Sequence, residues 1–460
     1  MIDKNLLEEL LSIAISTGAD FAEVFAERER SGQIRLVSGK IESVRDNLLS
    51  GVGIRAFLGT KTYYASTSDT SREGLLRCAA AVAGAVGDKN GTATTINLTP
   101  EPITEDRIIH YPDSVETVRK ADILREAADA ASGLDEQISQ VSGTFQDVDR
   151  QFLVANTEGL YREDRKVRTR LAISAVATAN GENQSGFYGP GAGMGIEFFE
   201  TVSPRSVGEV AARQALTNLS AVYCPAGTMT VAIENGFGGV IFHEACGHSL
   251  EATSVGIGAS QMAGKLGQQI ANPKVTAIDD GSIAGAWGSF SIDDEGNPSQ
   301  RTVLIENGIL KNYMVDRLGS RRMGMPMTGN SRRENYTFEP TSRMTNTFIA
   351  NGPDKNEDII ASMEYGLYAK AMGGGSVNPL TGEFNFSVKE GYIVRNGKIC
   401  EAVRGASLIG SGEKILQDID MVGQNLATGQ GVCGSASGNV PTDVGQPLIR
   451  VRKITVGGRS

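Results

Sequence analysis

The sequence predicts an α+β protein whose two domains meet near residue 220. Before that point, alternating strand patterns give way to amphipathic helical patterns, and this succession occurs twice. After it, short strands separated by turn signals dominate, and the 56 glycines of the chain are concentrated there. We therefore expect residues 1–220 to form antiparallel sheet plus helices, with a weak internal repeat. Residues 221–460 should form a mostly antiparallel β barrel or sandwich-like domain that carries one functional helix.

The first unit of the expected repeat begins with a helix and two hairpins. Leucines recur at helical spacing after Asp3, a suitable N-cap, and Gly18 ends the run. Residues 33–44 alternate around a Ser-Gly turn, and residues 51–65 alternate around a Leu-Gly-Thr turn. Both patterns are typical of hairpins.

A second helix and a linker follow these hairpins. Thr70 or Ser71 should cap the helix, which ends at Gly87. Residues 99–112 contain three prolines and mixed charge, and this composition indicates a linker or surface loop. Ser114 should then cap the helix that starts the second unit.

The strand pattern returns in the second unit. Strands are expected at residues 138–148, 152–155 and 168–179. The pair Ser203-Pro204 places an N-cap residue before a proline at the first helical position, and so predicts the last helix of this half.

The second half of the chain has a different sequence pattern. Residues 225–227 (Pro-Ala-Gly) mark the boundary, and a strand at residues 229–233 leads into a segment with two histidines. Residues 256–271 are rich in Gly and Gln and are expected to form a mobile loop. From Val275 onward short strands prevail, and residues 355–363 alone have a helical pattern.

Composition narrows the classes of function. The formal net charge of −10 and the pI of about 5.1 argue against direct binding to nucleic acid or to an anionic membrane. The N-terminus lacks the features of a signal peptide, and no apolar run approaches the ~18 residues of a membrane span. Five scattered cysteines suggest reduced thiols. These features predict a cytoplasmic protein.

The segment at residues 235–251 holds the strongest chemical signal. Two of the three histidines of the chain, His243 and His248, lie five residues apart, and Glu244 directly follows the first. Two imidazoles and a carboxylate on one short helix suggest a zinc site with a built-in general base. The alternative is two ordinary histidines at the start of a Gly-rich helix.

The spacing H-E-x-x-x-H does not fit a regular helix. At about 100° per residue, five steps leave two side chains about 140° apart, whereas the four steps of H-E-x-x-H leave them about 40° apart. We therefore expect a helix that is widened locally by a π-type turn, with Gly247 lowering the cost of the distortion.

A third metal ligand must come from elsewhere, because a catalytic zinc usually takes three protein ligands. Cys246 lies near His243 on the helix, and Cys433 lies in a Gly-flanked segment expected to be a tight loop. Spacing alone does not decide which of the two thiols is the third ligand. Cys78 is expected in the core, and Glu251 is either a ligand, a partner to a histidine N–H, or an exposed helix residue.

The segment from His243 to Glu251, with the Gly-Gly-Val-Ile-Phe before it, resembles the TldD/PmbA family of metalloproteases, also called modulators of DNA gyrase. The resemblance extends along most of the chain through residues 51–55, 65–67, 294–296, 306–308, 329–334, 343–347, 373–375, 432–434 and 444–447. Because the H-E-x-x-x-H motif is intact, the chain is similar to the TldD-type catalytic subunit and not to the PmbA/TldE type.

The resemblance implies one Zn²⁺ per chain, held by His243, His248 and Cys433, with Glu244 as the catalytic base. It further implies that the substrate is an unfolded or extended peptide. It also implies a dimer that encloses the site, either a homodimer or a heterodimer with a TldE/PmbA-like chain.

These features predict a zinc-dependent metallopeptidase. Arg332, Arg333 and Tyr336 are candidates for contacts to the substrate or for support of the tetrahedral oxyanion, although clustered arginines are more often solvated or paired. The alternative is a non-enzymatic interaction or regulatory protein with a structural zinc, which a closed four-ligand site would favour.

Overall fold

A computed structural model describes residues 2–87, 95–101, 108–378 and 382–459 of the chain. The elements of the first 220 residues are α1 (Lys4–Ile15), β1 (Phe21–Val37), β2 (Lys40–Leu58), β3 (Lys61–Thr67), α2 (Arg72–Val86), β4 (Thr99–Pro100), the 3₁₀ turn η1 (Pro112–Ser114), α3 (Thr117–Ser132), β5 (Ile138–Asn156), β6 (Leu160–Ala179), β7 (Glu182–Tyr188), β8 (Gly191–Ala192), α4 (Phe198–Thr201) and α5 (Pro204–Ser220).

A repeated order of elements organises this half. Helix, three-stranded meander and helix occur as α1-β1-β2-β3-α2 and again as α3-β5-β6-β7 followed by α4 and α5. The two meanders join through β1 and β5, which pair antiparallel with Phe25 opposite Val154. The resulting sheet has the order β3-β2-β1-β5-β6, with β7 and β8 beyond β6. It is antiparallel except for the short parallel pairing of β4 with β6.

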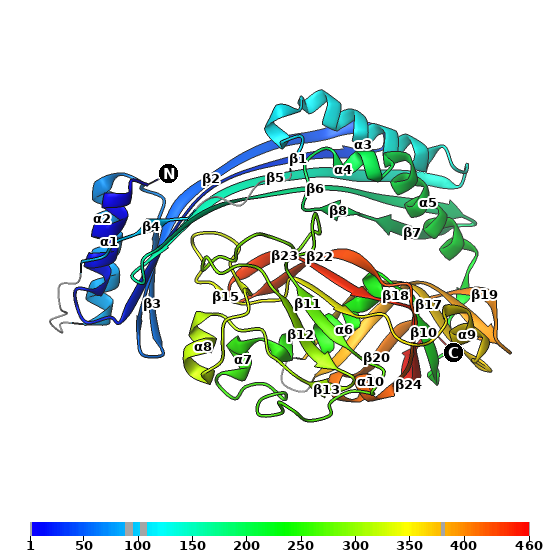
Figure 1. The fold of residues 1–460 in the computed structure, drawn as a ribbon. Coiled ribbons are helices and arrows are strands. Elements are labelled where there is room, and N and C mark those ends of the chain that lie inside the picture. The colour runs from blue at the N-terminus through cyan, green and yellow to red at the C-terminus, as the bar shows by residue number, and fades with distance from the viewer. Residues whose placement is uncertain (1, 88–94, 102–107, 379–381, 460) are drawn as a thin grey trace.

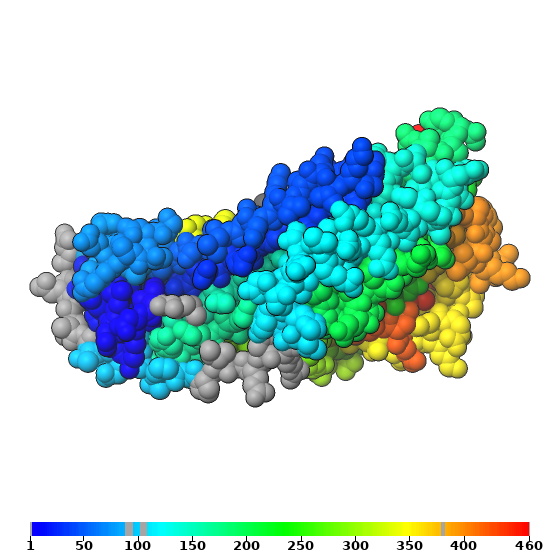
Figure 2. All heavy atoms as spheres, turned by 90° about the horizontal axis from the view of Figure 1, so that it is seen from above, coloured from blue at the N-terminus to red at the C-terminus, as the bar shows by residue number. Residues whose placement is uncertain are grey.

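Two helical layers cover parts of this sheet. The leucines of α1 pack with α2 and one end of the strands in a core that includes Leu7, Leu10 and Leu75. At the other end, α3 and α5 lie side by side on the outer face and bury Leu124 and Val207 against β5 and β6. Full burial of one such side chain contributes about 1.5–3 kcal/mol. The long strands arch over the rest of the molecule (Figure 1), and Figure 2 shows the outer face from above.

The elements after residue 220 are shorter. They are β9 (Val222–Tyr223), β10 (Gly227–Ile233), η2 (Phe237–Gly239), α6 (Val240–Ala245), η3 (Gly247–Leu250), α7 (Ala252–Val255), β11 (Ala277–Asp280), β12 (Arg301–Glu306), β13 (Ile309–Leu310), α8 (Arg317–Met323), β14 (Ser331–Arg332), β15 (Thr341–Ser342), β16 (Asn346–Ile349), α9 (Asn356–Ala361), β17 (Tyr365–Val377), β18 (Glu383–Arg395), β19 (Lys398–Arg404), β20 (Ser407–Ser411), α10 (Gly412–Asp418), β21 (Ile419–Val422), β22 (Ala427–Ser435), β23 (Gly438–Gln446) and β24 (Ile449–Gly457).

A closed barrel and a second sheet enclose the histidine helix. Strands β17, β10, β24, β20 and β18 pair in a ring, because β18 also pairs with β17. The barrel is mixed and not antiparallel throughout, since β10 and β17 run parallel. A six-stranded sheet in the order β13-β12-β11-β16-β23-β22 lies beside it, and α6 packs between the two (Figure 1). The α+β class and the barrel are thus confirmed.

Several sequence-based predictions need correction. The strand patterns at 138–148 and 152–155 belong to one continuous strand, because alternating burial persists through β5. Ser114 lies in η1, and Glu116 takes the N-cap position of α3. Helices α7, α8 and α10 were not predicted; each has only four to seven residues, too few for a periodic signal. Part of the predicted linker, residues 102–107, lies outside the described residues.

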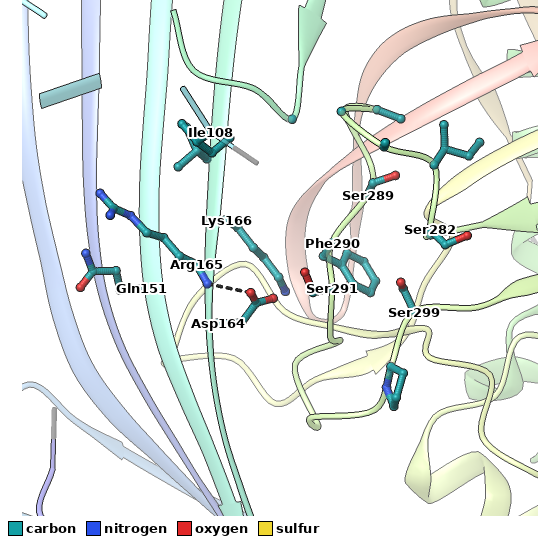
Figure 3. Close-up of a pocket in the computed structure, with 18 of the residues that line it drawn as sticks. Ile108, Gln151, Asp164, Arg165, Lys166, Ser282, Ser289, Phe290, Ser291 and Ser299 are labelled. Atoms are coloured by element: carbon teal, nitrogen blue, oxygen red, sulfur yellow. Dashed lines mark hydrogen bonds between the residues drawn. The ribbon is translucent and has the colours of Figure 1, made fainter. Parts of the chain in front are cut away.

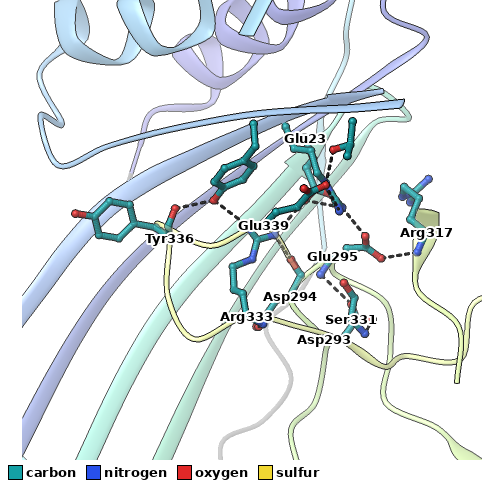
Figure 4. Close-up of polar contacts among 12 residues, drawn as sticks. Glu23, Asp293, Asp294, Glu295, Arg317, Ser331, Arg333, Tyr336 and Glu339 are labelled. Carbon is teal, nitrogen blue, oxygen red and sulfur yellow. Dashed lines mark hydrogen bonds and ion pairs between the residues drawn. The ribbon is translucent and has the colours of Figure 1, made fainter. Parts of the chain in front are cut away.

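Buried ion pairs join the long sheet to the second half of the chain (Figure 4). Arg55, fully buried on β2, lies 2.9 Å from Glu23 of β1 and also pairs with Glu295. Arg333 donates a hydrogen bond of 3.1 Å to the same Glu23. Removal of one partner from such a buried network leaves an uncompensated charge, which costs about 3–5 kcal/mol.

Within the described residues, none of the helices is long and apolar enough to cross a membrane.

Candidate metal centre

The histidine segment is a broken helix. Helix α6 ends at Ala245, Cys246 adopts φ −132° and ψ −43°, and a 3₁₀ turn continues from Gly247 to Leu250. The backbone N–H of Cys246 still bonds to Phe242, whereas that of Ser249 bonds to Cys246 at 2.9 Å. The prediction of a widened π-type turn is therefore wrong. A break in the backbone, followed by the tighter 3₁₀ turn, reorients the second imidazole.

Gly247 leaves room at this break for a side chain of another segment. A Cβ atom built at Gly247 would lie 2.3 Å from Sδ of Met344. The sequence predicted a special role for this glycine through backbone freedom, but the structure gives it one through close packing instead.

Three ligand-type side chains converge here. Nε2 of His243 lies 3.2 Å from Sγ of Cys433, and Nε2 of His248 lies 3.3 Å from the same sulfur. All three donor atoms lie within 4.8 Å of one another. The two rings stand nearly perpendicular, at 83°, with centroids 5.1 Å apart. This group can hold a metal ion.

Cys433 reaches the histidines from a strand and not from the tight loop that its flanking glycines predicted. It lies on β22, opposite Val440 of β23, close to the turn of this hairpin. The hairpin is an edge of the six-stranded sheet, and β23 pairs with β16. The sheet thus brings position 433 next to a helix that lies about 190 residues earlier in the chain.

The two imidazoles have opposite pKa shifts because their neighbours differ. Burial lowers the pKa of His243 well below its usual value, and the positive charges of His248 and Arg343 lower it further. Burial also lowers the pKa of His248, but Glu251 and Cys433 together outweigh this effect and raise the pKa well above its usual value. Nδ1 of His248 lies 3.3 Å from Oε1 of Glu251.

Glu244 lies at the cleft beside the three ligand-type side chains. Its Oε2 lies 3.7 Å from Nε2 of His248, and burial raises the pKa of its carboxyl group. Glu244, His248 and Glu251 line a cleft of about 440 Å³, whose other walls include Ser249 and Ser260. A carboxylate, a group that can hold a metal ion and a cleft that can hold a ligand therefore lie next to one another.

The sequence did not predict Arg343 as a site residue. It is fully buried, and its guanidinium donates to the backbone carbonyl oxygens of Cys433 and Gly438 and to Oγ of Ser437. Its Nε lies 3.9 Å from Oε1 of Glu251. The sequence held no signal for this role, because the partners come from distant segments.

The other sequence candidates lie elsewhere. Cys246 is fully buried in the apolar core, where burial raises the pKa of its thiol to about 12, and it is not part of the three-residue group. Arg332 donates to the carbonyl oxygens of Met344 and Pro441. Arg333 and Tyr336 lie at the contact with the long sheet (Figure 4). The contacts of these three residues give no support to an oxyanion role.

A further cavity is separate from the metal group. It measures about 700 Å³ and lies between β6 and the segment at residues 281–291 (Figure 3). Lys166 and Phe290 line it, as do several serines, but none of the three metal-ligand candidates does.

The sequence of the chain matches three domain models of one protein family. The PmbA/TldA metallopeptidase C-terminal domain matches residues 226–458, the central domain of that family matches residues 110–219, and its domain 1 matches residues 22–85. The chain belongs to the PmbA/TldD metallopeptidase family. This confirms the resemblance seen in the sequence.

Curated relatives of this family are similar over the full length of the chain. A metalloprotease TldD homolog of Haemophilus influenzae is 38% identical over 462 residues, covering 98% of this chain and 96% of that protein. A metalloprotease of Methanothermobacter thermautotrophicus is 31% identical and covers 99% of both chains. The chain is accordingly a TldD-like metalloprotease.

Solved structures share the fold. A Thermotoga maritima protein described as a modulator of a DNA gyrase has a TM-score of 0.79 at 22% identity, covering 99% of this chain and 100% of that chain. TldE from Thermococcus kodakarensis has a TM-score of 0.78 at 18% identity, covering 98% and 100%.

Proposed function

We propose that this TldD-like chain is a zinc-dependent metallopeptidase that hydrolyses peptide bonds in unfolded or extended peptides. The observation that carries the proposal is the convergence of His243, His248 and Cys433 beside the cleft that His248 and Glu244 line. Residues 1–220 and 221–460 would be its two domains, and its compartment the cytoplasm.

The three donor atoms fit zinc. Tetrahedral zinc with Zn–S of about 2.3 Å and Zn–N of about 2.0–2.1 Å requires N···S separations of about 3.5 Å. The observed separations from Sγ of Cys433 are 3.2 and 3.3 Å. A relative from Saccharolobus solfataricus named zinc metalloprotease TldD homolog supports the choice of metal; it is 32% identical over 223 residues, 48% of this chain and 49% of that protein. His243, His248 and Cys433 would hold one Zn²⁺ per chain.

Zinc, when bound, supplies Lewis-acid polarisation of the scissile carbonyl and acidifies water. Glu244 accepts the proton of the attacking water, whose oxygen bonds to the carbonyl carbon. The same carboxyl group returns the proton to the amine nitrogen as the C–N bond breaks. Its raised pKa suits both roles, because a group with a pKa nearer neutrality exchanges a proton more readily at working pH.

The cleft supports an extended substrate. Its volume of about 440 Å³ accommodates a few residues of a peptide but not a folded domain. Strand β22, with Gly434 and Ser435 lining the cleft, offers backbone groups to which an extended chain can add as a strand. We further propose a dimer, formed either with a second copy or with a TldE/PmbA-like chain; the similarity in fold to TldE supports such a partner.

A peptide-release assay tests this function. The chain is incubated with an unfolded peptide, with and without a chelator, alone and with a TldE-like partner. Hydrolysis that is lost on chelation and restored by Zn²⁺ is expected in at least one of these arrangements. Tight metal binding without hydrolysis in any of them would favour the alternative, an interaction protein with a structural zinc.

A further inference from the structure

A second cavity, of about 410 Å³, lies between the inner face of β5 and β6 and the β22–β23 hairpin that carries Cys433. Its walls are rich in cations. Five of them are nine-tenths buried or more: Arg150, Lys166, Arg168, Arg332 and Arg333. We refer to this space as the arginine cavity.

Three of these cations have carboxylate partners. Nζ of Lys166 lies 2.7 Å from Oδ1 of Asp294. Arg150 donates to Glu27 at 2.5 Å, and Arg333 donates to Glu23 at 3.1 Å. Their charges are therefore compensated by the protein.

Arg168 and Arg332 have no such partner. Arg168 is 6% exposed and donates to the backbone carbonyl oxygens of Trp287 and Ser289 at 2.8 and 3.5 Å. Arg332 is 4% exposed and donates to two backbone carbonyl oxygens and a threonine hydroxyl. Among the residues that the structure describes, neither guanidinium has a carboxylate within ion-pair distance, and Nη1 of Arg168 has no hydrogen-bond partner.

The two guanidiniums also repel other positive charges. Burial lowers the pKa of Arg168 to about 10, with a further contribution from Arg150. Burial lowers the pKa of Arg332 to about 9, with a further contribution from Arg168. Carboxylates at a distance oppose these shifts without cancelling them: Glu29, Asp294 and Asp443 for Arg168, and Asp294 and Asp279 for Arg332.

The acidic residues of the cavity do not remove this excess. Asp294 is taken by Lys166, Asp147 pairs with Lys120 at 2.7 Å, and Glu334 accepts the backbone N–H of Asn439. Glu29 is half-buried, and in the described part of the chain it forms no ion pair with either arginine. The burial of two unpaired guanidiniums is costly, and buried charges are normally paired.

We propose that the arginine cavity binds a carboxylate, supplied by an acidic side chain or the C-terminus of the peptide substrate, with Arg168 as its main donor. A planar guanidinium matches a carboxylate in shape and in hydrogen-bonding geometry. This substrate assignment rests on the proposed peptidase function. It makes acidic peptides the preferred class.

The fold connects this cavity to the metal group. Val432 lines the arginine cavity, while the next residue, Cys433, faces the histidines, as alternate side chains of a strand must. Arg332 also holds Pro441, opposite Val432 in the same hairpin. A ligand in the cavity therefore lies across one β-hairpin from the proposed zinc ligand. Lys166 lines both this cavity and the larger one in Figure 3, so the two spaces adjoin.

Binding to an inactive form tests the proposal. In Glu244→Gln protein, affinities are measured for four otherwise identical peptides: with Glu or Gln at an internal position, and with a free or amidated C-terminus. At constant ionic strength, at least one carboxylate is expected to improve binding by about tenfold, the value of one charge-assisted hydrogen bond. Arg168→Gln should abolish this preference without changing the affinity for the neutral peptide.

Arg170→Gln is the matched control. Arg170 lies two residues along β6, on the same face, and also donates to backbone carbonyl oxygens, but it does not line the arginine cavity. It should leave the preference intact. If Arg168→Gln lacks a cooperative thermal transition, Arg168→Lys replaces it; this change keeps the charge but not the fork of donors, and should reduce the preference at least about threefold.

A second arm distinguishes a free ligand from the peptide. Stabilisation of the protein by succinate, lost in Arg168→Gln and kept in Arg170→Gln, with no preference among the peptides, would assign the site to a free carboxylate and overturn the substrate assignment. Equal binding of all peptides and no effect of succinate would overturn the site altogether. Zinc-dependent hydrolysis by the unmodified chain is measured separately, so a failure of the peptidase function is recognised independently of these outcomes.

Discussion

Nη2 of Arg343 donates a hydrogen bond of 2.5 Å to the backbone carbonyl oxygen of Cys433. The same guanidinium approaches Glu251, whose carboxylate lies 3.3 Å from Nδ1 of His248. One buried side chain thus contacts both the hairpin that carries the thiol and the carboxylate beside the second histidine. Residues that orient metal ligands in this way typically contribute about 10–100-fold to metal affinity.

Arg343→Met should therefore weaken zinc binding by about 10–100-fold while the chain still folds. Competition with a chromophoric chelator measures the affinity, and the metal-free thermal transition reports on folding. Arg317→Met is the control, since Arg317 is also buried but pairs with Glu158. An unchanged zinc affinity in Arg343→Met would show that the hairpin keeps Cys433 in place without this contact.

The metal assignment predicts a contrast between two buried cysteines. Cys433→Ala should lose most of its zinc, because two imidazoles alone bind the ion more weakly than three ligands do. Cys246→Ala should keep one zinc per chain and lose about 1–2 kcal/mol of unfolding free energy, because it only removes a small buried side chain. Elemental analysis after gel filtration measures the zinc content of each variant. The reverse pattern would transfer the third ligand to Cys246.

Glu244→Gln should separate catalysis from binding. Glutamine keeps the size of the side chain but cannot accept the proton, so the rate of peptide hydrolysis should fall by at least about 10²–10⁴-fold. Zinc content and thermal stability should stay near those of the parent, and peptide should remain bound uncut. Loss of the metal instead would make Glu244 a ligand, and full activity would exclude it as the base.

Asp316 should make stability depend on pH. Burial, together with the nearby Glu295, raises the pKa of Asp316 to about 7, whereas an unfolded aspartate titrates near about 3.9. Between these values the folded state holds a proton that the unfolded state has lost. This contribution to the unfolding free energy is therefore full below about pH 4 and is lost as the pH rises towards about 7.

Asp316→Asn removes this titration but keeps the cap of α8, because an amide oxygen can still accept the N–H of Gly319. Relative to the parent, the variant should gain stability with rising pH, by at most about 1.4 kcal/mol per pH unit within this window. Urea unfolding at several pH values measures it, with Asp113→Asn at an exposed position as the control. Parallel curves for parent and variant would exclude this role.

Local patterns in the sequence were sufficient for much of the fold. The leucines after Asp3 gave α1 with its N-cap, and the turns at Ser38-Gly39 and Leu58-Gly59 gave the β1-β2-β3 meander. These elements depend on neighbours within a few residues. The barrel depends on the parallel pairing of β10 with β17, more than 130 residues apart, and no local pattern encodes such a pairing.

The sequence by itself determined the chemistry of this protein: two histidines, a glutamate and a set of thiols in a pattern typical of zinc peptidases. Only the tertiary structure decided how they meet. The break at Cys246 turns His248 towards His243, and the six-stranded sheet brings Cys433 to both. It also set Arg168 and Arg332 in a shared cavity without a direct ion-pair partner among the described residues. The physical reason is that side-chain type is local information, whereas burial and charge compensation depend on which distant segments pack together.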